Sequence, residues 1–217
     1  MARVFVITGP SGVGKGTLIR QLRDRIPALG LAVSATTRPP RPGERDGVDY
    51  HFLSAVEFDR RLAAGDFVEH ATYAGRRYGT LRSELEARLS RGEPVVLEIE
   101  LQGARQVREA MPEAVQVFIA PPSRTALRAR LASRGTDASE DIEQRLRTAE
   151  DELRAQREFS HVVVNDRLQD AADELTRIVG ARLADAPSVE PKAPKSGGPT
   201  TIGGAATLDL PDEGRKS

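Results

Sequence analysis

Cysteine and tryptophan are absent from this chain of 217 residues, and aromatic residues make up only 4% of it. Without cysteine the chain has no disulfide framework, no thiolate metal ligand and no cysteine nucleophile. No apolar stretch approaches the roughly 20 residues that a membrane-spanning helix requires. The first residues, MARVFVITGP, run directly into a motif and do not resemble a secretory signal. We therefore expect a soluble, cytoplasmic protein with no membrane partner.

A net charge is also missing, because 32 basic residues balance 32 acidic residues. The chain is therefore not strongly basic overall, as nucleic-acid-binding proteins commonly are. We expect no nucleic-acid partner and only a local anion site. Lysine is scarce as well: before residue 190 the chain has 27 arginines and one lysine, Lys15. That isolated lysine indicates a position where a compact ammonium group is required and a planar guanidinium would not replace it.

The nonapeptide GPSGVGKGT, residues 9–17, surrounds this lysine and follows the apolar run RVFVI at 3–7. Its glycines let backbone N–H groups converge at the positive end of the next helix, which suits a di- or triphosphate. In the pattern G-x-x-x-x-G-K-[ST] a hydroxyl follows the lysine directly, but here it comes one residue late, at Thr17. Lys15 is expected to bridge the β and γ phosphates. The predicted phosphate-binding residues are Gly9, Pro10, Ser11, Gly12, Val13, Gly14, Lys15, Gly16 and Thr17.

The rest of the chain alternates apolar strands with helical segments. Strand patterns recur at VVLEI (95–99), VQVFIA (115–120) and HVVVN (161–165). Helices are expected at 15–25, 102–110, 123–133, 140–157 and 170–183. The alternation predicts an α/β fold of the P-loop NTPase type, with a parallel sheet and helices on both of its faces.

Residues 34–80 break this alternation and predict an inserted substrate-binding module. The stretch TTRPPRPGERDGVDY (36–50) contains three prolines and two glycines. SAVE (54–57) predicts a capping box that opens a short helix, and FVEHATYAGRRYG (67–79) predicts a hairpin around Ala74 and Gly75. Prolines beside Arg38 and Arg41 stiffen a loop in which two guanidinium groups can converge on one phosphate.

The last 33 residues, from Asp185 onward, contain five prolines, five glycines and no aromatic residue. Such a composition buries too little apolar surface to offset the entropy lost on ordering. We therefore expect one domain at 1–184 and a disordered tail at 185–217.

Four separated stretches resemble the guanylate kinase family in order and spacing. They are VSATTRPPRPGERDGVDYHF (33–52), FVEHATYAGRRYGT (67–80), LEIELQG (97–103) and the RG(x)9R span from 134 to 145. The resemblance covers residues 3 to about 183, and the G-K-G-T form of the loop is one that we associate with nucleoside monophosphate kinases. It implies an enzyme that transfers the γ-phosphoryl group of ATP to GMP, with Mg²⁺ accompanying ATP.

The resemblance also implies roles for residues outside the loop. It assigns Arg38, Arg41, Tyr50 and Tyr78 to the phosphate of GMP, and Ser34, Glu69 and Thr80 to the guanine edge. A carboxylate such as Glu69 can accept both the N1–H and the amino group of guanine, a pair of donors that adenine does not offer.

Two further groups complete the predicted site. Glu98 and Glu100 follow an apolar strand, at the mouth of the pocket, where a carboxylate can hold Mg²⁺-bound water or the amino group of the base. The family resemblance leads us to expect aspartates at both positions. No direct metal ligand is assigned, and Mg²⁺ is expected near Thr17 and Glu98. Arg134 and Arg145 bracket a polar segment within a predicted lid at 123–157, and by resemblance they stabilise charge during transfer.

Some alternatives remain at this stage. Asn165 and Asp166 could contact ATP or simply cap a turn. The chain could be a P-loop kinase acting on a ribose bisphosphate, although Ser34, Glu69 and Thr80 would then have no base to read. It could also be a noncatalytic scaffold that binds phosphorylated peptides, although the intact Lys15 opposes this. The oligomeric state is not indicated.

Overall fold

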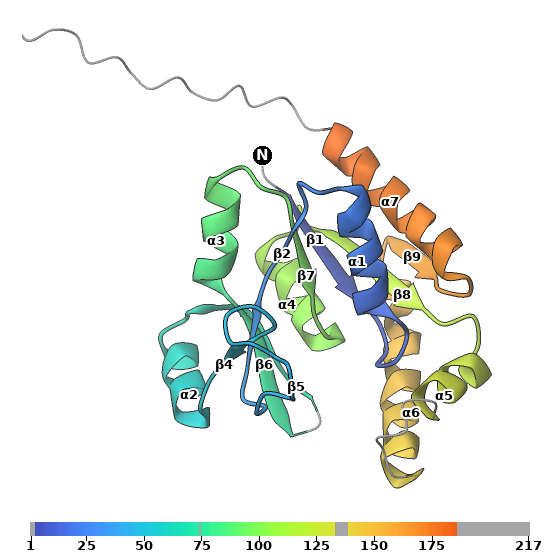
Figure 1. The fold of residues 1–217 in the computed structure, drawn as a ribbon, viewed down its shortest axis with the longest axis horizontal. Helices are drawn as coiled ribbons and strands as arrows, with labels where there is room; N and C mark the ends of the chain where they lie inside the picture. Colours follow the sequence, from blue (N-terminus) through green and yellow to red (C-terminus); the bar gives the residue numbers. More distant parts are fainter. Residues whose placement is uncertain (1–2, 74, 133–138, 186–217) are drawn as a thin grey trace, which may run out of the picture. The chain divides into compact units, whose positions relative to one another are not determined.

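The computed structural model describes residues 3–73, 75–132 and 139–185, with the side chains of 139–145 left out (Figure 1). All of these residues belong to one unit, Met1–Pro187. Except for Asp185, the predicted tail lies outside the described residues. Within the described part of the chain, no helix is both long enough and apolar enough to cross a membrane.

Sheet A is the centre of the fold and contains five parallel strands in the order β2-β7-β1-β8-β9. The strands are β1 (Val4–Thr8), β2 (Gly30–Leu31), β7 (Val95–Glu98), β8 (Val115–Ala120) and β9 (His161–Val164). The central strand β1 pairs with β7 through Val6 and Leu97, and with β8 through Ile7 and Val117. Every residue of β1 is buried, as expected for a strand with both faces covered.

Helices cover both faces of sheet A, which confirms the predicted architecture. They are α1 (Lys15–Arg25), α3 (Arg82–Ser90), α4 (Leu101–Ala110) and α7 (Leu168–Ala184). Two further helices, α5 (Arg124–Ala132) and α6 (Ser139–Arg154), pack mainly on each other. One core contains side chains of α1 and α7 packed on Ile7 and Ile119, and the other contains side chains of α3 and α4 packed on Val6 and Phe118. A 3₁₀ turn, Ala155–Glu158, follows α6 where one continuous helix was predicted.

The inserted module forms sheet B, with strand order β4-β3-β6-β5, and one helix. Its elements are β3 (Ser34–Thr36), β4 (His51–Phe52), α2 (Ala55–Ala63), β5 (Phe67–Tyr73) and β6 (Arg76–Leu81). The hairpin is as predicted, with Ala74 itself outside the described residues. Only half of the predicted capping box forms. Ser54 accepts a hydrogen bond from the Glu57 N–H, but the Glu57 carboxylate pairs with Arg60 and Arg61 instead.

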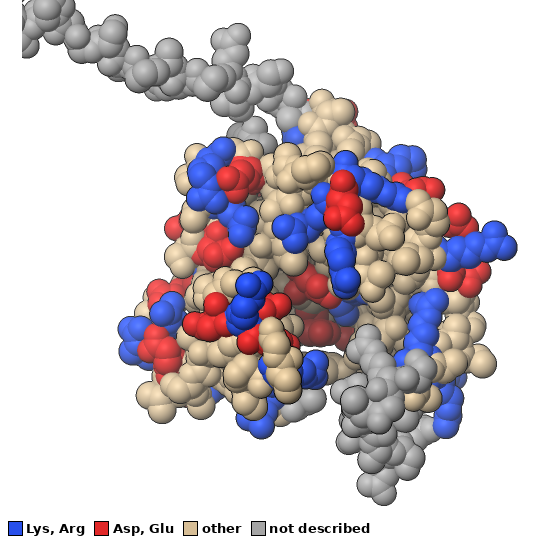
Figure 2. All heavy atoms as spheres, viewed as in Figure 1, with Lys and Arg blue, Asp and Glu red and all other residues tan. Residues whose placement is uncertain are grey.

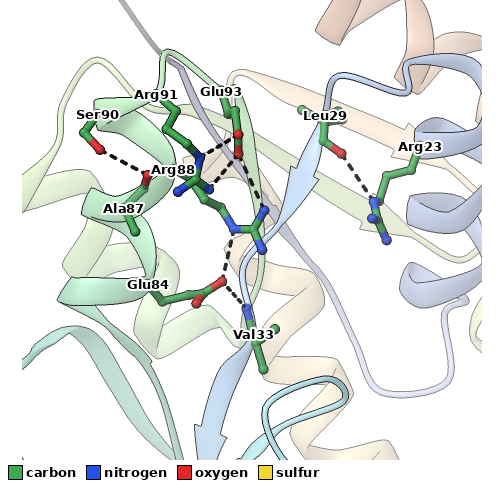
Figure 3. Close-up of polar contacts among 9 residues, drawn as sticks. All are labelled: Arg23, Leu29, Val33, Glu84, Ala87, Arg88, Ser90, Arg91 and Glu93. Atoms are coloured by element: carbon green, nitrogen blue, oxygen red, sulfur yellow. Dashed lines mark hydrogen bonds and ion pairs between the residues drawn. The ribbon is translucent and has the colours of Figure 1, made fainter.

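Helix α3 ties the module to sheet A near the place where the chain leaves β2 (Figure 3). The Glu84 carboxylate accepts hydrogen bonds from the Val33 N–H and from Arg88, at 3.4 and 3.0 Å. Arg88 also reaches Glu93, just before β7, at 3.9 Å. Neither α3 nor the two-residue strand β2 was predicted. Figure 1 shows the module and helices α5 and α6 extending from the edge where the strands of sheet A end.

Candidate active site

The phosphate loop follows β1 and is shaped by glycines in conformations that other residues avoid. Gly9 has φ of 144°, and a Cβ there would lie 2.3 Å from the carbonyl oxygen of Ile119. Gly14 has φ of 98° and ends the loop as the N-cap of α1. Because this N-cap has no side chain, the first N–H groups of α1 point at the loop uncovered, as an anion site requires.

Lys15 lies across this loop and is largely buried. Its Nζ donates to the carbonyl oxygen of Gly9 at 2.5 Å and points toward that of Pro10 at 3.4 Å. Only 9% of the residue is exposed. The ammonium group is therefore held where phosphate oxygens bound in the loop would meet it.

Gly16 occupies the position where the strict motif has a hydroxyl. A Cβ there would lie 3.7 Å from a carboxylate oxygen of Glu98, which is ordinary van der Waals contact. Packing alone therefore does not require this glycine, and its effect is to leave the approach to Glu98 open. The hydroxyl is supplied by Thr17, which is exposed in the first turn of α1 and faces the same cleft.

A cleft of about 450 Å³ joins the loop to the module. Most of the predicted residues line it: Pro10, Ser11, Gly12, Gly14, Lys15, Gly16, Thr17, Ser34, Arg38, Arg41, Tyr50, Glu69, Tyr78, Glu98 and Glu100. Gly9, Val13 and Thr80 lie beneath its surface and are buried. Figure 2 shows a hollow at the centre of the view with acidic side chains inside it, and several glutamates do line the cleft.

The predicted guanine-reading residues form one row across sheet B. Ser34 on β3 pairs with Thr80 on β6, and Thr80 pairs with Glu69 on β5. The Thr80 hydroxyl donates to Oε1 of Glu69 at 2.8 Å. Thr80 is fully buried, so in this structure its hydroxyl orients the carboxylate and does not face the cleft.

Glu69 is a buried carboxyl group at the inner wall of the cleft, with 3% of the residue exposed. Burial raises its pKa to about 7, although the hydrogen bonds from Thr80 oppose the shift. The negative charge of Glu100 adds a smaller increase to the same pKa. A buried carboxylate with an incomplete set of donors is suited to a ligand that brings its own N–H groups.

The four predicted phosphate ligands lie together at the outer part of the module. The Arg38 guanidinium lies 5.3 Å from the centre of the Tyr50 ring, and the Tyr50 and Tyr78 rings are 6.2 Å apart. Glu44, which was not predicted, holds this loop. It accepts from Arg38 at 2.8 Å and from the Arg41 N–H at 2.7 Å. A phosphate bound here would be a second anionic acceptor beside the Arg38 guanidinium and the Arg41 N–H.

Glu98, at the end of β7, and Glu100, the N-cap of α4, stand between the loop and the module. Burial raises the pKa of Glu98, and the nearby Lys15 charge lowers it. Glu152 of α6, which was also not predicted, lies near Glu100 and Lys15. Burial and the Glu100 charge raise its pKa to about 8. The sequence feature that could have identified Glu152 is its place one turn from the buried Ala149, because an acid on an apolar helix face is unusual.

Asn165 braces the loop from beneath. Its side-chain amide donates to the carbonyl oxygen of Val13 at 2.8 Å, and its backbone carbonyl oxygen accepts from the Arg130 guanidinium. Helix α7 begins two residues after Asp166, with Arg167 as N-cap, and Asp166 is exposed. The Asn165 side chain is therefore committed to the loop backbone in this structure.

The predicted lid arginines cannot be placed. Arg134 lies outside the described residues, and Arg145 lies in α6 at a position whose side chain is not described. Their roles remain predictions from the sequence.

The comparisons with known proteins agree on one family. The family model for guanylate kinase matches residues 1–182 of this chain. The chain belongs to the guanylate kinase family. A guanylate kinase of Gloeobacter violaceus is 52% identical over 87% of this chain and 92% of its own length. One of Frankia casuarinae is 55% identical over 80% of this chain and 95% of its own length.

A solved structure gives the same answer for the fold. The crystal structure of guanylate kinase from Anaplasma phagocytophilum matches with a TM-score of 0.69 and 32% identity, covering 83% of this chain and 86% of that one. The P-loop α/β fold and the family predicted from the sequence are thereby confirmed. Membership of this family gives the chain the ATP-dependent phosphorylation of GMP to GDP as its activity.

Proposed function

We propose that loop 9–17 holds the phosphates of ATP and that the module at 34–80 holds GMP, so that the two substrates meet in the cleft between them. The observation that carries this division is the position of two buried charged groups on one cleft. Lys15 lies on the loop side and Glu69, held by Thr80, lies on the module side. An ammonium group suits phosphate, and an ionised carboxylate suits the two adjacent donors of guanine.

On the module side, Ser34 and Glu69 contact the guanine edge, and Thr80 orients Glu69 from behind. The phosphate of GMP is bound by Arg38, Arg41, Tyr50 and Tyr78 at the outer end of the cleft. Because Glu44 already pairs with the Arg38 guanidinium and accepts from the Arg41 backbone N–H, phosphate binding gives Arg38 a second anionic partner in a loop that Glu44 has already ordered.

The transfer itself requires alignment more than covalent chemistry. An oxygen of the GMP phosphate forms a bond to the γ-phosphorus of ATP, while the bond from that phosphorus to the bridging oxygen of ADP breaks. Lys15 and the N–H groups at the start of α1 hold the β and γ phosphates in place. We assign Arg134 and Arg145 to the developing charge on the transferred group, in agreement with the sequence prediction.

Mg²⁺ fits the oxygen groups beside the loop. The Thr17 hydroxyl and the Glu98 carboxylate both face the cleft, and Glu100 has a buried carboxylate oxygen without a partner among the described residues. No three acidic or histidine side chains of the described chain are grouped to hold a metal by themselves. This suits Mg²⁺, which commonly takes one or two protein oxygens and completes its shell with phosphates and water. When bound, the ion neutralises charge on the phosphates.

The product GDP places the enzyme in guanine nucleotide recycling, and we propose that it acts in the cytoplasm, where ATP is supplied. A coupled assay that offers ATP with GMP, AMP, dGMP or a ribose bisphosphate tests the acceptor directly. We expect GMP to be the preferred acceptor, dGMP to be used because it has the same base, and AMP and ribose bisphosphate to be rejected. Comparable rates with GMP and AMP would show that the guanine site is assigned wrongly.

A further inference from the structure

Helix α4 touches the Glu69 carboxylate at a residue that has no side chain. A Cβ built on Gly103 would lie 2.1 Å from Oε2 of Glu69 and 2.9 Å from the carboxyl carbon. The first distance is far shorter than two such atoms can approach. Oε2 therefore occupies the space that any other amino acid at residue 103 would fill. Glycine is unfavourable in a helix, and this contact supplies a packing reason for it at residue 103 of α4.

Helix α4 cannot easily withdraw to make room, because Gln106 fastens it to the same strand. The Gln106 side chain accepts from the His70 N–H at 3.1 Å and donates to the His70 carbonyl oxygen at 2.6 Å. His70 is the neighbour of Glu69 on β5, and Gln106 is one helical turn from Gly103. The distance between α4 and the strand is thus fixed beside the carboxylate.

The other carboxylate oxygen is also held. Oε1 accepts the hydroxyl of the buried Thr80. The two oxygens therefore have different surroundings. Oε1 accepts a hydrogen bond, and Oε2 fills the space left by the missing side chain of Gly103. An added methyl group at residue 103 would have to turn the carboxylate away from Thr80 or move it out of its place in the cleft.

We propose that Gly103 is a specificity-determining position that sets the orientation of Glu69 toward guanine. The inference rests on the proposed role of Glu69 in reading the base. Gly103 acts only through Glu69, so it is a positioning residue and has no contact with ATP. Filling its space should therefore weaken GMP binding while leaving ATP binding intact.

The test compares Gly103→Ala with Gly180→Ala in the full chain. Gly180 is also inside a helix, α7, and a Cβ there would meet nothing within 4 Å. KM and kcat are measured for GMP and for ATP, and the melting temperature of each variant is recorded. We expect Gly103→Ala to raise KM for GMP by at least about 20-fold and to change KM for ATP by less than about 2-fold, because one buried polar contact is misplaced. Gly180→Ala should change neither constant.

A second pair of variants ties the effect to Glu69. Glu69→Asp withdraws the carboxylate from residue 103 by one methylene group. Adding Gly103→Ala to Glu69→Asp should then change KM for GMP by less than about 2-fold, because the two closest contacts, at 2.1 and 2.9 Å, are already gone. If the two changes multiply, or if Gly103→Ala raises both Michaelis constants alike, the inference is overturned.

Glu69→Gln in the otherwise unchanged chain distinguishes failure of the guanine-site assignment from failure of the Gly103 positioning role. If it lowers GMP use and Gly103→Ala does not, the positioning role is wrong and the guanine site stands. If Glu69→Gln has no effect on GMP kinetics, the guanine site itself is wrong and the inference falls with it.

Discussion

The two halves of the active site are built by different means. In the phosphate loop the contacts that set the backbone and the lysine are local: the Val13 N–H donates to Pro10, and Lys15 donates to Gly9, six residues away. In the guanine site the contacts are distant in the sequence. Gln106 binds the backbone of His70, 36 residues away, and Gly103 lies against Glu69. The loop is thus shaped mainly within one short peptide, with Asn165 and Ile119 supporting it from outside, whereas the guanine site is assembled from segments far apart in the sequence.

This difference predicts separable defects. Changes in the loop should remove ATP handling and leave GMP binding, and changes around Glu69 should do the reverse.

Replacing Lys15 with Met should abolish transfer, lowering kcat by roughly 10³-fold or more, because the β and γ phosphates lose their buried cation. GMP affinity, measured by calorimetry, should stay within a few-fold, since Lys15 lies on the loop side of the cleft. Lys15→Arg should be almost as inactive, because a planar guanidinium does not fit the place of an ammonium group. Loss of GMP binding with an unchanged circular dichroism spectrum would contradict the separation.

Replacing Glu69 with Gln should lower kcat/KM for GMP by about 2 to 4 kcal/mol, which is on the order of 30-fold to 1,000-fold. The new amide NH₂ confronts a donor of guanine where an oxygen accepted it before. Unchanged KM for ATP is part of the prediction. Glu57→Gln is the matched control, because Glu57 is on α2 and pairs with Arg60 and Arg61 away from the cleft. Equal loss in both variants would argue against a specific role for Glu69.

The pH dependence of guanine binding should follow the Glu69 carboxyl group, whose burial raises its pKa to about 7. The charged form accepts the guanine donors, and protonation removes it as pH falls through the pKa. Affinity should therefore drop up to about tenfold per unit below pH 7. Guanosine as a competitive inhibitor is the better probe, because a phosphate group itself titrates near pH 6. An inhibition constant that is flat from pH 5.5 to 8 would contradict this assignment.

Removing the Asn165 side chain, which holds the loop backbone, should give a smaller defect that affects ATP and not GMP. Asn165→Ala removes the 2.8 Å donor to the buried carbonyl oxygen of Val13, which keeps only a 3.4 Å hydrogen bond from Arg130, so we expect a loss of about 0.5 to 1.5 kcal/mol of stability. KM for ATP should rise by roughly 10-fold or less, and KM for GMP should stay unchanged. Gln169→Ala, at an exposed position in the first turn of α7, is the control. A larger effect on GMP than on ATP would show that the two halves are not separable.

How much of the site the sequence predicts follows the same division. The turn at residues 9–17 between a strand and a helix was predicted, because glycine spacing, the lysine and the following helix are all local signals, and its binding of ATP stays a prediction. The main strands and helices of sheet A were predicted from their apolar periods. The cleft also brings together most of the residues that the family resemblance assigned to GMP.

The missing parts depend on contacts between distant segments. Glu44 carries no local mark of function and Glu152 carries only its place on an apolar helix face, and their roles depend on Arg38 in one case and on Glu100 in the other. Helix α3 was missed because its sequence, RSELEARLS, buries only Leu85. Gly103 was part of the quoted LEIELQG stretch, but its purpose requires knowing that Glu69 lies against it.

The last and smallest effect concerns Glu152, where the two halves of the site meet. Burial, together with the Glu100 charge, raises its pKa to about 8, against an ordinary value of 4.5. The folded chain therefore keeps a proton that the unfolded chain releases between pH 4.5 and 8, so this group lowers the free energy of unfolding as pH rises through that window.

Glu152→Gln mimics the protonated form at every pH, since an amide NH₂ can also donate to Glu100. The variant should match the wild type near pH 4.5 and exceed it by about 1 to 2 kcal/mol at pH 8.5, seen as a melting temperature a few degrees higher. Glu86→Gln, which changes an exposed residue of α3, should show no such divergence. A constant difference between Glu152→Gln and the wild type across the whole range would mean that Glu152 stays charged, and that Lys15 outweighs both burial and Glu100 in setting its pKa.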